Sequence, residues 1–144
     1  MALIVRLVRV DEAGDGCDRG VGASVSLVST AGLDLLAREA GVDRVDGRRF
    51  RMLFTLDDTE PNEEDAWLGR RVAVGDAIVT VRGLAGRCVV TSQHPDTGDK
   101  DLDTLRTLRG YRPEVEGEEP LPMGVWGSVE QPGRVRVGDT AEAL

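Results

Sequence analysis

The sequence alternates between short apolar runs and clusters of glycine, proline and acidic residues, a pattern typical of strands separated by turns. The apolar runs are rich in Val, Leu and Ile, and most are too short for a helix. We expect strands at residues 2–10, 24–28, 48–54, 71–74, 77–81, 123–129, 134–137 and 140–144, and in the β-branched run that begins at Cys88.

Two segments instead repeat their apolar residues at helical spacing. The repeating positions are Leu33, Leu36, Ala37 and Ala40 in the first segment, and Leu102, Leu105 and Leu108 in the second. Ser29 or Thr30 can cap the first helix, and Gly41 ends it. Asp101 can cap the second helix, and Gly110 closes it. The first helix presents one apolar stripe, which should pack on a sheet.

These elements predict one domain over residues 1–144, mostly β with two helices, in the α+β class. A chain of 144 residues is long enough to bury a proper core as a single domain. No strand–helix–strand repeat is present, which argues against a parallel doubly wound sheet. Many short strands at this spacing favour a closed antiparallel or mixed barrel. The glycine-rich segment 11–22 and the acidic segment 111–122 are expected to be surface loops.

Composition and charge narrow the classes of function. The net charge of −8 argues against nucleic acid as the main partner. No apolar run approaches the ~18 residues of a membrane span, and the N-terminal run lacks the cleavage site of a signal peptide. Two cysteines make neither a disulfide framework nor a four-cysteine zinc site. We therefore expect a cytoplasmic protein in which Cys88 is a free thiol and Cys17 is an incidental exposed one.

Cys88 is the residue with the clearest candidate chemistry. It follows Arg87, and a fixed positive charge favours the thiolate, the form that attacks electrophiles and binds soft metals. A cysteine in an apolar strand can equally be a small buried hydrophobe. His94, six residues later, is either an acid–base partner of Cys88 or a histidine exposed in the turn at Pro95, and we prefer the second interpretation.

Arg49 and Arg51 would share one face of the expected strand at 48–54, because alternate residues of a strand point to the same side. Two guanidinium groups about 7 Å apart on one face suit an oxyanion such as a phosphate. The alternative interpretation is a pair of solvated arginines at a strand edge.

Five motifs, in order along the chain, carry a resemblance to a known family. They are Val25-Ser26-Leu27-Val28-Ser29-Thr30 leading into a helix, Arg48-Arg49-Phe50-Arg51, Glu64-Asp65-Ala66-Trp67-Leu68-Gly69, Arg87-Cys88 followed by Asp96-Thr97-Gly98, and Pro132-Gly133 followed by Gly138-Asp139. This pattern resembles the MOSC domain, which molybdenum-cofactor sulfurases carry in their C-terminal region and which the mitochondrial amidoxime-reducing enzymes share. The resemblance covers residues 23–144.

The resemblance implies a MOSC-type β-barrel that binds the molybdenum cofactor, molybdopterin. The resemblance further implies that Cys88 either carries sulfur as a persulfide or ligates molybdenum. Asp139 resembles an acid that approaches the metal, although a Gly-Asp turn residue explains it equally well. The residues that match the family's cofactor-binding positions are Arg49, Arg51, Arg87, Asp96, Thr97 and Gly98.

Two departures from the family pattern bear on cofactor binding. Where the family commonly has Pro-Asn after Arg-Phe-Arg, this chain has Met52-Leu53, so Leu53 removes one polar contact if that asparagine binds cofactor. The β-domain that precedes the MOSC region in the amidoxime-reducing enzymes has no counterpart ahead of residue 23. From this we expect weaker cofactor binding or the need for a partner protein.

Three functions are compatible with these observations. In the first, the protein binds molybdopterin and supports the reduction of N-hydroxylated compounds through a cysteine-ligated metal. In the second, Cys88 carries sulfur as a persulfide to a partner, and the implied partners are then a sulfur-donor or redox protein. In the third, the fold is retained without cofactor. Family association adds pyridoxal phosphate binding as a further expectation.

Overall fold

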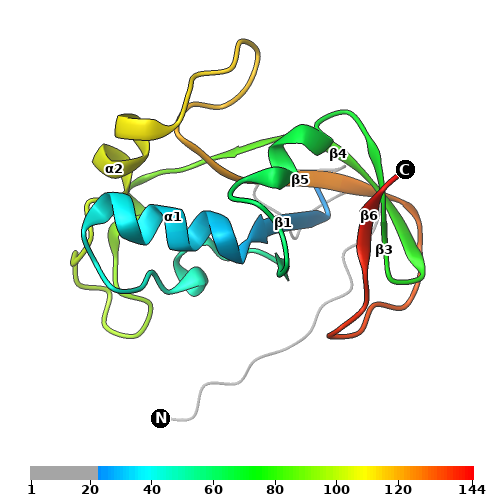
Figure 1. The fold of residues 1–144 in the computed structure, drawn as a ribbon, viewed down its shortest axis with the longest axis horizontal. Helices are drawn as coiled ribbons and strands as arrows, with labels where there is room; N and C mark the ends of the chain where they lie inside the picture. The colour runs from blue at the N-terminus through cyan, green and yellow to red at the C-terminus, as the bar shows by residue number, and fades with distance from the viewer. Residues whose placement is uncertain (1–22) are drawn as a thin grey trace.

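The computed structural model describes residues 23–144, which form one mixed sheet with two α-helices beside it (Figure 1). The strand expected at 2–10 and the loop that contains Cys17 lie outside the described residues. The strands are β1 (Val25–Ser29), β2 (Phe54–Leu56), β3 (Arg71–Val74), β4 (Ala77–Gly86), β5 (Pro122–Gln131) and β6 (Ala141–Ala143). They pair in the order β2-β1-β5-β4-β3-β6.

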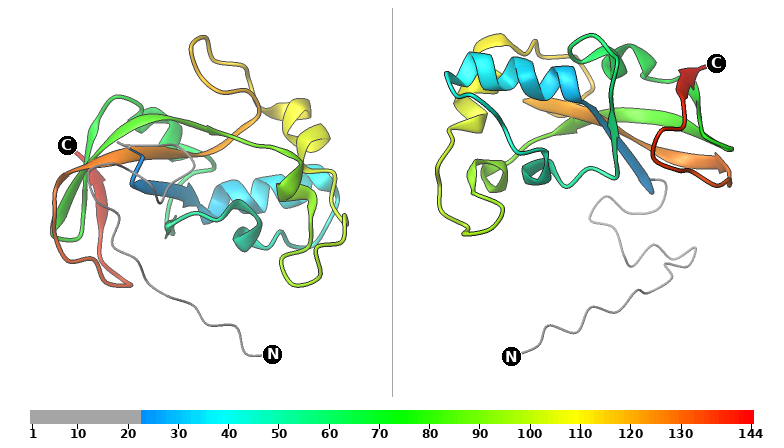
Figure 2. Two further views of the ribbon diagram at one scale, coloured as in Figure 1. Left: turned by 180° about the vertical axis from the view of Figure 1, so that it is seen from behind. Right: turned by 60° about the horizontal axis from the view of Figure 1, so that its bottom comes forward.

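Only β1 and β2 are parallel among these neighbours, and the remaining pairs are antiparallel. The ten-residue strands β4 and β5 form the centre, and their pairing contains register shifts that bend the sheet. The sheet therefore curls around its own core (Figure 2). The expected hairpin between β3 and β4 is confirmed, with Gly75 and Asp76 in its turn.

Helix α1 (Thr30–Ala40) follows β1 directly, as the sequence predicts. The Ser29 hydroxyl accepts the Gly32 N–H, which satisfies one of the free donors at the start of the helix. Gly41 ends α1 with φ of 71°, a left-handed conformation that glycine adopts without a side-chain clash. In Figure 1, α1 and α2 lie together at the end of the molecule opposite β3 and β6.

Helix α2 (Thr104–Tyr111) begins two residues later than expected. Its cap is Asp103, which accepts the Arg106 N–H, and not Asp101. The carboxylate of Asp101 is instead paired with Arg49, so a tertiary contact decides where this helix begins.

Two apolar clusters share the sheet. One contains Trp67 of the short 3-10 helix η2 (Glu63–Trp67), which is buried and covers part of the core. Its other buried members are Val25, Leu27, Leu56, Val72, Val74, Val79, Val81, Leu84 and Val125. The second cluster joins α1 and α2 to the sheet through Val28, Leu33, Leu36, Ala37, Val45, Phe50, Leu108 and Met123.

Three expected strands are wrong. The run that begins at Cys88 contains the 3-10 helix η3 (Val89–Ser92) in place of a strand. Residues 48–54 contain the 3-10 helix η1 (Gly47–Phe50), followed by Arg51 in a left-handed conformation, and β2 starts only at Phe54. Phe50 packs into the second cluster. The burial of this one side chain fixes the segment, so its residues do not point alternately to two faces as they would in a strand. Residues 134–137 are irregular, and Val137 is fully exposed. The expected class, α+β with two helices, is confirmed.

Candidate functional site

Cys88 lies on an exposed turn at the end of β4. The Arg87 N–H donates to the Leu121 carbonyl (3.2 Å), after which the chain leaves the sheet and enters the 3-10 helix η3 (Val89–Ser92). The Cys88 carbonyl accepts both the backbone N–H and the hydroxyl of Thr91, at 3.2 and 2.9 Å. The thiol is free and exposed. The interpretation of Cys88 as a buried strand residue is therefore wrong, because the chain turns here and buries Thr91 and Ser92 in its place.

The side chain of Arg87 turns inward from the same point. Its Nε and Nη2 donate to the Met123 carbonyl of β5, and its Nη1 donates to the Phe50 carbonyl of η1 at 3.1 Å. Nη2 also lies 2.9 Å from the Met52 sulfur, and the guanidinium lies 5.3 Å from the centre of the Phe50 ring. Arg87 thus joins the Cys88 turn to η1 and β5.

A cavity of about 560 Å³ opens between the start of α1 and the segment around η1. Its lining residues include Thr30, Leu33, Asp34, Arg44, Val45, Asp46, Gly47, Arg48, Arg51, Met52 and Thr55. Three of these are arginines, and the N-terminal residue of an 11-residue helix contributes a hydroxyl. Cys88 does not line this cavity, but Met52 does and also contacts Arg87, so one residue links the thiol turn to the cavity wall.

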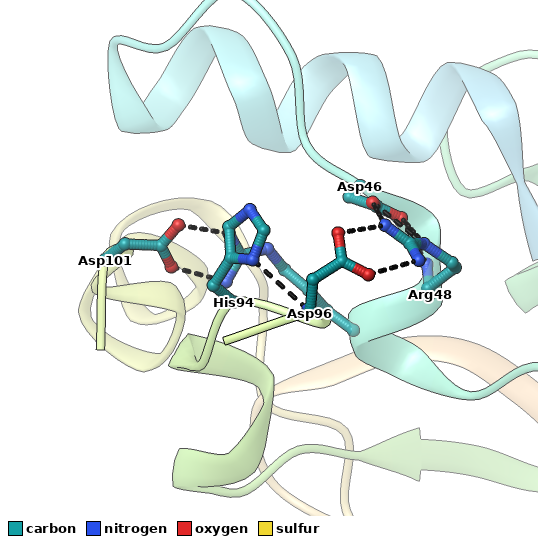
Figure 3. A network of polar contacts seen from close by, with 6 residues as sticks. Asp46, Arg48, His94, Asp96 and Asp101 are labelled. Atoms are coloured by element: carbon teal, nitrogen blue, oxygen red, sulfur yellow. Dashed lines mark hydrogen bonds and ion pairs between the residues drawn. The ribbon is translucent and has the colours of Figure 1, made fainter. Parts of the chain in front are cut away.

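Arg48 lies between two carboxylates, Asp46 and Asp96 (Figure 3). The shortest distances from its guanidinium are 2.7 Å to Asp46 and 2.9 Å to Asp96. Hydrogen bonds from Arg48 lower the pKa of Asp46 to about 2 and also lower the pKa of Asp96. Both acids therefore stay ionised at neutral pH, and Arg48 is already neutralised by the protein.

Arg49 is separated from Arg51 by the 3-10 geometry of η1. Its side chain is 7% exposed and forms an ion pair with Asp101, in which Nη1 lies 2.8 Å from Oδ1 and Nη2 lies 2.8 Å from Oδ2. Arg51, in contrast, is exposed, and no side-chain partner for it is found among residues 23–144. The expected shared face of Arg49 and Arg51 is wrong, because both residues lie outside any strand.

Asp96, Thr97 and Gly98 lie in a turn that begins at His94. The Gly98 N–H donates to the His94 carbonyl (2.9 Å), and Gly98 has φ of 77°, which a residue without a side chain adopts easily. The Thr97 hydroxyl accepts the Asp99 N–H, and His94 Nδ1 accepts the Asp96 N–H, each at 3.2 Å. Through Asp96 the turn is attached to Arg48 (Figure 3).

The structure does not bring Asp139 to Cys88. The Asp139 carboxylate accepts the Arg136 N–H at 2.8 Å and lies against Gly75, in the turn where β4 starts. Cys88 follows the other end of β4, and ten residues of strand span roughly 30 Å. This position agrees with the interpretation of Asp139 as a turn residue.

Several polar residues of this region were not predicted from the sequence to be site residues. Arg44, Arg48 and Thr30 line the cavity, and their only sequence signal is their closeness to the Arg-rich motif and to a helix start. Glu64 is completely buried, and its Oε1 accepts the Ser29 N–H at 3.0 Å. Burial raises the pKa of Glu64 above its ordinary value. The acidic and polar residues around Glu64 are typical of an exposed loop, so no signal in the sequence indicates this buried contact.

Two features of the described residues bear on cofactor and membrane. No cluster of three or more His, Cys, Asp or Glu that could hold a metal occurs in residues 23–144. No helix in that part of the chain has the length and apolar character to cross a bilayer. Lys100 is the chain's single lysine, and it lies exposed outside the cavity lining, so the cavity offers no amine for the Schiff base of pyridoxal phosphate.

Comparison with known proteins gives relatives of two kinds. The chain is 32% identical over 108 residues to mitochondrial amidoxime-reducing component 1 of Mus musculus, covering 70% of this chain and 31% of that protein. It is 37% identical over 97 residues to amidoxime reducing component 2 of Rattus norvegicus, covering 62% and 28%. It is 30% identical over 104 residues to the molybdenum cofactor sulfurase of Oryza sativa, covering 60% and 12%. The chain thus spans about a third or less of each relative's length.

A solved structure has the same fold. The YuaD protein of Bacillus subtilis superposes with a TM-score of 0.60 at 18% identity, covering 86% of this chain and 65% of that one. A family model described as the MOSC domain matches residues 17–142, almost the whole chain. The protein therefore belongs to the MOSC domain family.

Proposed function

We propose that this protein binds a molybdenum cofactor, with Cys88 as the sulfur donor to the metal and Arg51 as a ligand of the pterin's phosphate. The observation that carries the proposal is the joint placement of an exposed thiol and an arginine-lined cavity on segments that Arg87 ties together. The relatives named for amidoxime reduction and for molybdenum-cofactor sulfuration support this class of ligand.

The residues present fit such a group. A cysteine thiolate is a soft ligand, which suits molybdenum, and Cys88 is exposed rather than packed in the core. Arg51 and Arg44 line the cavity as cations, while Arg48 is held by Asp46 and Asp96. An arginine guanidinium binds phosphate oxygens through two parallel hydrogen bonds. The first turn of α1 adds the positive end of a helix dipole at the same cavity.

The cofactor and the protein residues would have different roles. The cofactor, when bound, supplies the redox chemistry needed to reduce an N-hydroxylated compound. Cys88 would hold the metal by its sulfur and Arg51 would bind the phosphate end, while Asp96 fixes Arg48 in the cavity wall. Arg49 is committed to Asp101 and supports the wall rather than the ligand.

The test is the molybdenum and pterin content of the protein purified from a cofactor-producing host. We expect both in the wild type, loss of molybdenum in Cys88→Ser, and reduced retention of pterin in Arg51→Ala. Cys17→Ser and Arg109→Ala, an exposed arginine of α2, are the matched controls and should leave both contents unchanged. A wild-type protein with neither molybdenum nor pterin would refute the proposal.

The exposure of Cys88 also favours a second candidate function, the carriage of sulfur to a partner. A thiolate that solvent reaches can accept sulfane sulfur from a cysteine desulfurase persulfide, leaving the donor's cysteine as a thiol. Mass spectrometry after incubation with a desulfurase and cysteine should then show one added sulfur on the Cys88 peptide. Absence of that mass on an intact, accessible Cys88 would exclude this function.

A further inference from the structure

The guanidinium of Arg87 contacts the residues on both sides of Arg51. Its Nη1 donates to the carbonyl of Phe50, the residue before Arg51, at 3.1 Å. Its Nη2 lies 2.9 Å from the sulfur of Met52, the residue after Arg51. The stacking of the guanidinium over the Phe50 ring adds a third contact to the same short segment.

Arg51 has a backbone conformation that needs such support. Its φ of 51° and ψ of 40° lie in the left-handed region, which side-chain-bearing residues rarely adopt. One backbone bond, from the Arg51 N–H to the Arg48 carbonyl at 3.2 Å, closes the turn from one side. In an extended conformation, the segment would continue as the strand that the sequence predicts, and the Arg51 side chain would leave its present direction.

Met52 is itself seated on the sheet. A Cβ atom at Gly124 of β5 would lie 2.5 Å from the terminal methyl of Met52. Because Gly124 has no side chain, the methionine can pack against β5 at this point. Arg87 bonds to the carbonyl of Met123, the residue before Gly124. The Arg87 guanidinium therefore holds η1 and Met52 against β5 at Met123. The turn at Arg51 is in this way attached to the central sheet.

We propose that Arg87 is a positioning residue: it holds the backbone of Arg51 in the left-handed conformation and thereby keeps the Arg51 side chain at the cavity. The inference rests on the proposed function, in which Arg51 binds the phosphate of the cofactor. It assigns Arg87 a role through Arg51, and not the direct cofactor contact that the family resemblance implies. Because Cys88 follows Arg87 in the chain, the same residue fixes the thiol turn relative to the anion ligand.

The three simultaneous contacts of residue 87 require an arginine. The planar guanidinium presents several N–H groups in fixed directions, and here they reach a β5 carbonyl, an η1 carbonyl and a thioether at once. A lysine keeps the charge but has one small ammonium on a flexible stem. Arg87→Lys therefore separates the geometry of the clamp from its charge.

The first test reads the backbone of Arg51 directly, without any ligand. Backbone chemical shifts and the H–N–Cα–H coupling of Arg51, measured by NMR, should indicate positive φ in the wild type and lose that signature in Arg87→Lys. Met52→Leu removes the sulfur acceptor without touching Arg87 and should weaken the signature partly. An unchanged left-handed signature in both variants would overturn the proposal.

The second test is a double-mutant cycle with inorganic pyrophosphate as the probe anion, its affinity measured by calorimetry. Arg87→Lys and Arg51→Ala should each weaken binding, the former by about five- to tenfold. Arg87→Lys should have no further effect in the Arg51→Ala background, because it acts through Arg51. Additive losses would show that Arg87 binds the anion itself and would overturn the positioning role.

The two tests separate failure of this inference from failure of the proposed function. A wild type that binds no pyrophosphate would refute the anion site, while the NMR experiment would still decide whether Arg87 sets the Arg51 conformation. A wild type that contains molybdenum and pterin, but whose Arg51 signature is insensitive to Arg87, would refute the inference alone.

Discussion

At the scale of single residues, the chemistry of the site depends on how a few side chains are exposed or paired. Cys88 is exposed on its turn, and Arg51 is an exposed cation. Arg49 is in the opposite condition, because its buried guanidinium is committed to Asp101. Neighbouring residues of one arginine-rich motif thus have different roles, and their exposure decides which of them can reach a ligand.

The exposure of Cys88 predicts its reactivity. In a Cys17→Ser variant, where Cys88 is the remaining thiol, we expect the folded protein to react with a thiol-specific disulfide reagent nearly as fast as the urea-unfolded protein. The reaction is followed by absorbance. Protection of the thiol by orders of magnitude in the folded state would mean that Cys88 is buried, contrary to the structure.

The buried carboxyl of Glu64 predicts a pH dependence of stability. Burial raises its pKa in the folded state above the value of about 4.3 for an unfolded chain. Between these two pKa values the folded state binds more protons, so the free energy of unfolding falls as pH rises through that window. Glutamine keeps an acceptor for the Ser29 N–H and does not titrate. Glu64→Gln should therefore gain stability relative to the wild type as pH rises.

Urea unfolding of both proteins at about pH 4 and about pH 8 measures this difference across the window. Glu63→Gln is the matched control, because Glu63 is exposed and its carboxylate accepts one backbone N–H, which an amide oxygen can also do. A stability difference between Glu64→Gln and wild type that stays constant with pH would contradict a raised pKa of Glu64 in the folded state.

At the scale of elements, the sequence predicts those whose signals are local. Ser29 and Gly41 bracket α1 by capping chemistry alone, so its bounds are recovered. The start of α2 is missed because Asp101 and Asp103 are both capping residues, and only the distant Arg49 distinguishes them. The Arg-rich segment is missed because the burial of Phe50 by the helices overrides strand propensity. The same limit applies to Cys88, whose exposure depends on a turn with no glycine or proline of its own.

The ion pairs between η1 and the segment 93–101 predict an order of effects. Asp101→Asn should lower the free energy of unfolding more than Asp96→Asn, because Asp101 is the partner of a buried arginine whereas both partners of the Arg48–Asp96 pair are largely exposed. Both substitutions are nearly isosteric, so packing is matched. Thermal unfolding measures both variants, and equal effects would contradict the assigned burial of Arg49.

At the scale of the whole molecule, the curled sheet links two clusters into one body. Both clusters contain residues of β1 and β5: Leu27 and Val125 belong to the first cluster, and Val28 and Met123 belong to the second. The two ends of β4 have separate roles: its start meets β3 and the Gly75 turn, and its end delivers Arg87 and Cys88 to the candidate site. The candidate site is therefore held in place by its attachment to the central strands β4 and β5.

Sharing of strands predicts cooperative unfolding, and we propose that the chain is a single domain. Leu36→Ala in the second cluster should lower the free energy of unfolding by about 2–5 kcal/mol, and Val81→Ala in the first cluster by about 1–3 kcal/mol. Each substitution should lower the midpoint temperature of one common transition. Differential scanning calorimetry measures this. Two separate transitions, each shifted by only one substitution, would contradict a single domain.

Ligation of molybdenum by Cys88 is tested by X-ray absorption spectroscopy at the molybdenum edge, on wild type and Cys88→Ser loaded in the same cofactor-producing host. We expect one more sulfur neighbour around molybdenum in the wild type than in the variant, or a variant that retains no metal. An identical sulfur shell in both proteins, or a wild type with no molybdenum to measure, would contradict it.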